Sequence, residues 1–289
     1  MEIREITRRN ALATIAGTAG LLLTEVAEGQ KEPEQAAKKT GFKQSVCKWC
    51  YGSMTVDALC EKSSKMGIRS VELLTEHDWA IPKKYGMVCA VGMGPSGIVD
   101  GWNRVEDHDR LVKESERLLP LVAAEKIPNM IVFSGNRRGI SDAAGLVNCE
   151  KGLKRIMKMA EELKVTVIME LLNSKRDHKD YQCDHTPWGV ELVKRVGSER
   201  FKLLYDIYHM QIMEGDVIAT IQENKDYIAH FHTGGVPGRN EIDTSQELNY
   251  PRIARAITDM GFTGYFAHEF IPRRDPMTSL KQAVELCTV

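Results

Sequence analysis

The feature that most constrains the fold of this chain is a repeated alternation of short apolar runs with longer amphipathic stretches, from residue 41 to residue 289. Eight runs have the length and composition of buried strands, and the stretches between them have the apolar spacing of helices. The predicted strands are 45–50, 70–74, 87–93, 130–135, 165–171, 202–208, 227–232 and 264–270. The predicted helices include 56–66, 107–125, 148–163, 189–196, 217–224 and 250–260. Alternating strands and helices indicate a parallel sheet made of βα units.

Eight βα units within residues 41–289 match the TIM barrel, the (β/α)8 fold, whose usual size is about 250 residues. The alternative is a doubly wound open sheet, which is expected to carry a glycine-rich phosphate-binding turn after its first strand. The stretch WCYGSMTVD at 49–57 is a poor candidate for such a turn. We therefore predict an α/β chain folded as a TIM barrel.

Residues 1–40 differ in composition from the rest of the chain. Basic residues precede a mildly apolar stretch at 11–23, and a polar segment follows, which is the layout of an export signal. The sequence TRRNAL at 7–12 resembles a twin-arginine signal, although Ala11 stands where the strongest form of that signal has Phe. We predict an export signal and linker over 1–40, a catalytic domain over 41–289 and a periplasmic or exported protein. The alternatives are an amphipathic helix packed on the domain and a cytoplasmic location.

Composition narrows the classes of partner. The formal net charge of −1 gives no electrostatic reason to expect nucleic acid or a membrane surface. No apolar run is long enough to span a bilayer, so we expect no membrane in the mature form. The seven cysteines are scattered and odd in number, which favours free thiols over a disulfide framework. Cys47 and Cys50 have redox spacing, but they lie in a strand-like run.

Polar side chains gather at the carboxyl ends of the last four predicted strands, where TIM-barrel active sites lie. The residues are Glu170 and Asn173, Asp206 and His209, His230 and His232, and His268 and Glu269. Ionisable groups in apolar strands are costly unless they are paired or bind a cation. We therefore predict one divalent metal ion held by three carboxylates and one imidazole. Mixed oxygen and nitrogen ligands suit Mn²⁺, Mg²⁺ or Co²⁺, and the absence of thiolates argues against a structural zinc site.

Four segments together resemble the hydroxypyruvate isomerase family, whose xylose isomerase-like TIM barrels are related to D-tagatose 3-epimerase. They are MELLNSKRDH at 169–178, LLYDIYHMQIMEGD at 203–216, IAHFHTGGVPGRNEID at 228–243 and HEF at 268–270. The resemblance covers nearly everything after residue 41. It implies an intramolecular oxidoreductase of the aldose–ketose type, or an epimerase, acting on hydroxypyruvate or a ketose-like sugar. An enediolate intermediate is expected for either reaction.

The resemblance also implies roles for individual residues. The implied metal ligands are Glu170, Asp206, His232 and Glu269. Members with hydroxypyruvate isomerase activity often carry Gln at the position of His232, whereas epimerase-type members carry His, which leaves the substrate open. Epimerase-type members also have a substrate-contacting Glu six positions after the first ligand. Arg176 stands there in this chain, so that contact is not carried over.

The expected reaction moves a proton between carbons next to a carbonyl group. Glu170 and Glu269 are the predicted catalytic base and acid, while the cation stabilises the enediolate charge. His209 and Arg239 match family residues that contact substrate oxygens. We expect His230, deeper in its strand, to support His232 or to pack.

Other residues near the predicted strand ends are weaker candidates. Asn136 and Trp102 are predicted to bind substrate, with Trp102 or Trp49 forming a wall of the pocket. His178 and His185 lie in a long loop after the fifth predicted strand, where we expect them to be exposed.

Three other functions compete with an isomerase or epimerase. A lyase or deglycosidase acting on 3-keto sugars would use the same metal site. An endonuclease IV-like DNA repair enzyme would need more histidines at strand ends and a basic groove; the first four predicted strand ends offer only His77. A non-catalytic binding protein has no need of all the implied site residues. We therefore expect a small sugar or hydroxy-keto acid as the partner and no nucleic acid. Whether the chain forms a homo-oligomer is left open.

Overall fold

A computed structural model describes residues 41–289 of the chain. The predicted export signal and linker, residues 1–40, lie outside the described residues. None of the helices in the described part is both long and apolar enough to cross a membrane.

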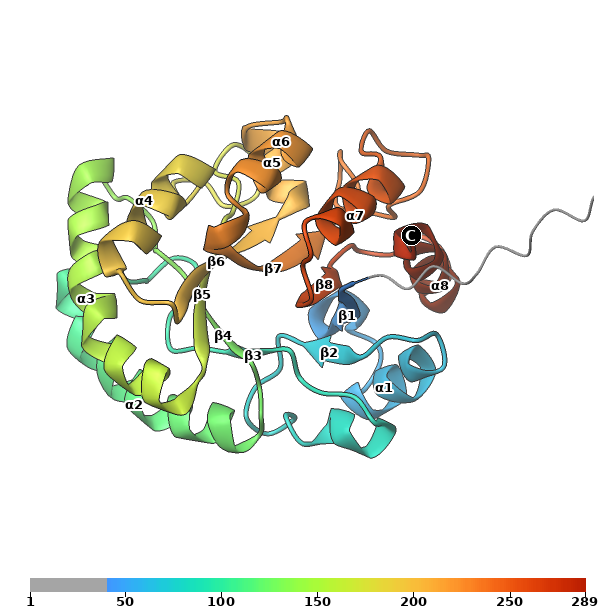
Figure 1. The fold of residues 1–289 in the computed structure, drawn as a ribbon, viewed down its shortest axis with the longest axis horizontal. Helices are drawn as coiled ribbons and strands as arrows, with labels where there is room; N and C mark the ends of the chain where they lie inside the picture. Colours follow the sequence, from blue (N-terminus) through green and yellow to red (C-terminus); the bar gives the residue numbers. More distant parts are fainter. Residues whose placement is uncertain (1–40) are drawn as a thin grey trace, which may run out of the picture. The chain divides into compact units, whose positions relative to one another are not determined.

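Eight parallel strands form the centre of the described domain (Figure 1). They are β1 (Lys43–Cys47), β2 (Ser70–Glu72), β3 (Val91–Met93), β4 (Asn129–Val132), β5 (Thr166–Glu170), β6 (Phe201–Asp206), β7 (Ile228–Thr233) and β8 (Tyr265–His268). Each strand pairs with its neighbours in the order β2-β1-β8-β7-β6-β5-β4-β3. Isolated parallel bridges, Ser70 with Val88 and Leu74 with Gly92, join the two ends of this order. The predicted TIM barrel is therefore confirmed.

Helices lie outside the strands (Figure 1). They are α1 (Val56–Ser64), α2 (His108–Ala124), α3 (Asp142–Leu163), α4 (Thr186–Val196), α5 (Ile207–Met213), α6 (Val217–Glu223), α7 (Tyr250–Asp259) and α8 (Pro276–Cys287). The described residues also form short 3-10 helices, namely η1 (Lys48–Tyr51), η2 (Ile81–Tyr85), η3 (Val105–Asp107) and η4 (Lys225–Tyr227).

The boundaries of several predicted strands were wrong for local reasons. The sixth was predicted to continue to residue 208, but β6 ends at Asp206. There the Asp206 carboxylate accepts the His209 backbone N–H at 3.1 Å and caps α5. The first was predicted to reach residue 50, but β1 ends at Cys47 and the chain continues directly into the 3-10 helix η1.

The interior of the barrel is polar beneath its carboxyl end. Residues two apart on a strand face the same side, and His230 and His232 both point inward, with ring centroids 5.1 Å apart. Phe231 between them packs against Phe262, with ring centroids 4.9 Å apart. All seven cysteines are free thiols, as predicted.

Candidate active site

Four ionisable side chains converge at the carboxyl end of the barrel. Glu170 ends β5, Asp206 ends β6, His232 lies in β7 and Glu269 follows β8. All four are buried, and one ligand atom from each lies within 4.8 Å of the others. The register explains this, because Asp206 pairs with His232 across β6 and β7 and the Glu269 N–H donates to the Thr233 carbonyl at 3.1 Å. The structure thus brings together the four side chains that the sequence predicted as ligands.

The carboxylates of this group are crowded around few positive partners. His232 Nδ1 lies 2.8 Å from Glu269 Oε2 and 3.2 Å from Glu170 Oε1. Arg239 Nη2 donates to Glu269 Oε2 at 2.5 Å and to Asp206 Oδ2 at 3.2 Å. Burial raises the pKa of Asp206 to about 8 and also raises the pKa of Glu170. Burial opposes ionisation of Glu269 too, but Arg239 and His232 hold its pKa well below the usual value.

The chemistry of these donors fits a divalent cation. Three carboxylates and one imidazole, all buried and within reach of a common point, form a donor set suited to Mn²⁺, Mg²⁺ or Co²⁺. Without a cation, protonation of Glu170 and Asp206, whose pKa values are raised by burial, would relieve the repulsion among the carboxylates.

Glu72, to which the sequence assigned no role, supports this group from inside the barrel. It ends β2, is fully buried and accepts hydrogen bonds at Oε1 from His230 Nε2 at 2.7 Å and His232 Nε2 at 2.9 Å. Burial would raise its pKa, but the two histidines lower it to about 2, so the carboxylate is ionised. An ionised carboxylate only accepts, so His232 donates through Nε2 and its Nδ1 faces the other carboxylates. Carboxylates commonly orient metal-binding histidines in this way.

His209 presents a buried donor to the site. Asn173 Oδ1 accepts the backbone N–H groups of Arg176 and Asp177, both at 3.0 Å, which places the Asn173 amide nitrogen 2.6 Å from His209 Nδ1. Burial lowers the pKa of His209 well below its usual value. The neutral ring therefore accepts at Nδ1 and carries its proton on Nε2. That nitrogen has no hydrogen-bond partner and lies 3.6 Å from Asp206 Oδ2, so it is free to donate to a ligand oxygen.

Arg239 is held between two aromatic rings. Its guanidinium carbon lies 5.1 Å from the centroid of the Trp49 ring and 5.3 Å from that of Tyr208. Trp49 also donates its indole N–H to Glu269 Oε1 at 2.6 Å. These contacts restrict the guanidinium to a position beside the carboxylates.

A cavity of about 520 Å³ opens over this group. Its lining residues are Trp49, Leu73, Thr75, Met93, Ile98, Ile131, Phe133, Glu170, Leu172, His178, Arg239 and Glu269. Trp49 forms part of the wall, as predicted. The expectation that His178 is exposed was wrong, because its loop folds back and sets the ring 5.2 Å from that of His209. His185 is exposed, as expected.

Trp102, Asn136 and His209 were predicted to bind substrate, but none of the three lines the cavity. His209 nevertheless lies beside the ligand group, with Nε2 3.6 Å from Asp206 Oδ2. Trp102 is completely buried and packs against His108 and α3, where Gly152 leaves room for the indole. A Cβ at Gly152 would lie 2.8 Å from the Trp102 ring. The backbone of Asn136 makes two hydrogen bonds. Its N–H donates to the Val99 carbonyl, and its carbonyl accepts from the side-chain amide of Asn103.

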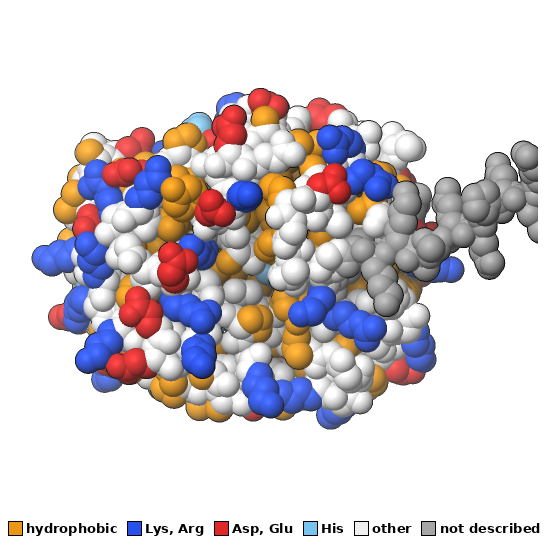
Figure 2. Space-filling model, in the orientation of Figure 1, with side chains coloured by type: hydrophobic (Ala, Val, Ile, Leu, Met, Phe, Trp, Pro, Cys, Tyr) orange, Lys and Arg blue, Asp and Glu red, His pale blue; other side chains and the backbone are white. Residues whose placement is uncertain are grey.

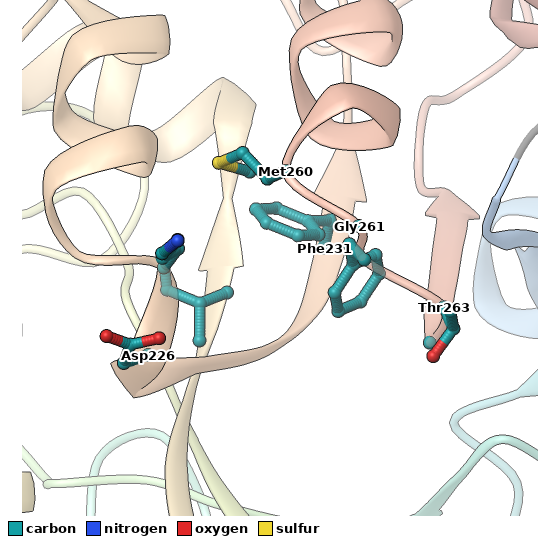
Figure 3. A pocket seen from close by; sticks show the side chains of 9 residues that line it. Asp226, Phe231, Met260, Gly261 and Thr263 are labelled. Carbon is teal, nitrogen blue, oxygen red and sulfur yellow. The ribbon is translucent and has the colours of Figure 1, made fainter.

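Another hollow, of about 290 Å³, lies at the opposite end of the strands (Figure 3). It is formed where β7 and β8 begin, with Phe231, Met260 and Thr263 in its wall. Among residues 41–289, only Lys225 and Asp226 are ionisable residues of its lining, so these residues offer no comparable donor set. On the face drawn in Figure 2, basic and acidic side chains are interspersed.

The comparisons with known proteins agree with this architecture. Residues 60–288 match the family model described as xylose isomerase-like TIM barrel. A 2-oxo-tetronate isomerase of Cupriavidus necator is 37% identical over 109 residues, which are 38% of this chain and 41% of that protein. Hydroxypyruvate isomerase of Escherichia coli is 24% identical over 80% of this chain and 93% of its own length. A solved structure of AP endonuclease, family 2, from Brucella melitensis has a TM-score of 0.73 at 22% identity and covers 84% of this chain and 96% of that one.

Proposed function

Because the chain belongs to the xylose isomerase-like TIM barrel family, we propose that it is a divalent-metal-dependent isomerase or epimerase of a small hydroxy-carbonyl compound. Hydroxypyruvate and ketose-like sugars are the candidate substrates. The observation that carries the proposal is the convergence of three buried carboxylates and one imidazole at the mouth of the barrel. The isomerase names of two relatives support the reaction class.

In this proposal Glu170, Asp206, His232 and Glu269 hold the cation. When bound, a divalent cation supplies Lewis-acid stabilisation of the negative charge that develops on the substrate oxygens. Glu72 holds the proton on His232 Nε2 and so keeps Nδ1 available as a ligand.

Proton transfer falls to Glu170 and Glu269. Of the four proposed ligands, only these two line the cavity, and they enter it from different strand ends. One carboxylate takes the proton from the carbon next to the carbonyl group, and the other returns a proton to the neighbouring carbon or to the opposite face. His209 Nε2–H and the Arg239 guanidinium donate to substrate oxygens and fix the position of the reacting carbon.

Solvent-deuterium exchange tests the proposal directly. The full chain, reconstituted with Mn²⁺, is incubated in D₂O with hydroxypyruvate or a panel of ketoses, and exchange at the carbon next to the carbonyl is followed by NMR. We expect exchange in the wild type and none in Glu170→Gln or Glu269→Gln. The matched control is Glu223→Gln on the exposed surface of α6. Normal exchange in the Glu170→Gln, Glu269→Gln double variant would refute the proton-transfer roles.

Lyase or deglycosidase action on 3-keto sugars is the second candidate, because it begins with the same proton abstraction. The cavity volume of about 520 Å³ supports this second function, because that space accommodates a substituted sugar. The DNA-repair alternative is not proposed. Within residues 41–289, each group of side chains able to hold a metal includes His232, so the additional metal sites that such an enzyme needs have no separate donors.

A further inference from the structure

The cavity above the proposed ligands has two chemically different halves. The charged half contains Glu170, Glu269 and Arg239. The other half, the apolar wall, consists of Leu73, Met93, Ile98, Ile131, Phe133 and Leu172. These six side chains come from the ends of β2, β3, β4 and β5 and from the segments that follow them. A ligand in this cavity therefore meets charge on one side and hydrocarbon on the other.

The apolar wall is accessible and is maintained against backbone strain. Leu73, Met93 and Ile98 are only half-buried, so they keep apolar surface that a ligand would remove from water. Leu73 has a φ of 58°, in the left-handed region that is unfavourable for a leucine. Its backbone N–H donates to the Val91 carbonyl at 2.9 Å, which holds it in that conformation. Strained residues of this kind concentrate at ligand sites.

The charged half offers little to a substrate carboxylate. Arg239 is the only Lys or Arg among the twelve lining residues. Its guanidinium already contacts Glu269 and Asp206. A cavity of about 520 Å³ is also in the range that holds drug-sized ligands, which leaves most of it empty around a three-carbon acid.

We propose that the substrate is an uncharged sugar or hydroxy-ketone that carries an apolar substituent. Its hydroxy-carbonyl group lies at Glu170 and Glu269, and its substituent packs on the apolar wall. This inference rests on the proposed function and names the substrate class of the same site.

Binding of two unreactive probes tests the inference. Methyl β-D-glucoside and phenyl β-D-glucoside are titrated into the Mn²⁺-loaded full chain by calorimetry, with intrinsic tryptophan fluorescence as a second readout. Burying a phenyl ring at about 25 cal/mol per Å² predicts that the phenyl probe binds roughly tenfold or more tightly than the methyl probe. The corresponding 3-keto glucosides, compared by deuterium exchange, should show the same preference in kcat/KM.

Leu73→Asn is the decisive variant, because Asn tolerates the left-handed backbone and removes the apolar side chain. We expect it to reduce the phenyl preference, measured as the ratio of the two dissociation constants, severalfold. Leu121→Asn, at an exposed leucine of α2, is the matched control. Ile98→Ser, in the segment after β3, provides a second test if Leu73→Asn does not fold.

The outcomes separate this inference from the proposed function. Equal binding of the two probes, or a phenyl preference unchanged in Leu73→Asn and Ile98→Ser, would overturn the apolar substituent. Deuterium exchange into hydroxypyruvate, together with equal binding of the two probes, would support the proposed reaction and overturn the apolar substituent. A phenyl preference that is lost in Leu73→Asn, without exchange into any hydroxy-carbonyl compound, would support the apolar wall and overturn the reaction.

Discussion

Replacing Glu72 by Gln should weaken metal binding although Glu72 is not itself a proposed ligand. Its Oε1 accepts hydrogen bonds from His230 and His232, at 2.7 Å and 2.9 Å. Gln keeps the size and an acceptor oxygen but loses the negative charge. A hydrogen bond to a charged acceptor contributes about 1 kcal/mol more than one between neutral groups. The His232 bond alone therefore predicts about fivefold to tenfold weaker binding, which is at or just below the lower limit of the 10- to 100-fold range typical of such supporting residues.

Titration calorimetry with Mn²⁺ at fixed pH measures this effect, and thermal unfolding of the metal-free protein checks the fold. Glu72 Oε2 also accepts a buried hydrogen bond from Ser45 Oγ at 2.5 Å. Loss of charge from these three hydrogen bonds should lower the free energy of unfolding by about 3 kcal/mol, or roughly 6–12 °C in Tm for a domain of this size. Glu214→Gln is the control. Glu214 accepts from the Thr186 N–H at 2.6 Å and hydroxyl at 2.7 Å and lies outside the ligand group, so its loss should affect stability but not Mn²⁺ affinity. An unchanged Mn²⁺ affinity in folded Glu72→Gln would refute this reasoning.

Three further predictions concern the tautomer, the pH dependence and the N-terminus. Asn173→Asp places a hydrogen-bond acceptor against His209 Nδ1, so the His209 proton should move from Nε2 to Nδ1 and kcat/KM should fall about 100-fold. Imidazole ¹⁵N NMR shows whether the tautomer of His209 has changed. An unchanged tautomer together with complete loss of activity would contradict this role of His209. Metal affinity should rise with pH up to about 8, because burial raises the pKa of Asp206 to about 8 and the cation must displace that proton; an affinity independent of pH between 6 and 8 would count against Asp206 as a ligand. We also propose that residues 1–40 are an export signal and linker, so their deletion should leave a soluble and active protein, and aggregation of the shortened chain would instead indicate a structural role.

The carboxyl ends of β5 to β8 were predictable from sequence because each carries an ionisable residue in an otherwise apolar run. Glu170 and Asp206 are the last residues of their strands, and Glu269 immediately follows its strand. Parallel strands in register place such residues at one level. The sequence pattern is therefore sufficient to predict that these side chains lie close together.

The contacts that cross the barrel were not predictable in the same way. Glu72 meets His230 and His232 across 158 and 160 residues of sequence, and no periodic pattern reports which interior residues face each other. A carboxylate within the apolar second predicted strand, 70–74, was the available signal. Trp102 was wrongly placed because its position depends on how a loop packs against α3, which strand and helix periodicity does not specify.

Anomalous diffraction from crystals grown with Mn²⁺ tests the central claim most directly. The account predicts one strong peak with oxygen and nitrogen atoms of Glu170, Asp206, His232 and Glu269 at about 2.0–2.3 Å. A fully loaded protein whose peak lies elsewhere, or whose peak is contacted by only one of these side chains, would contradict it.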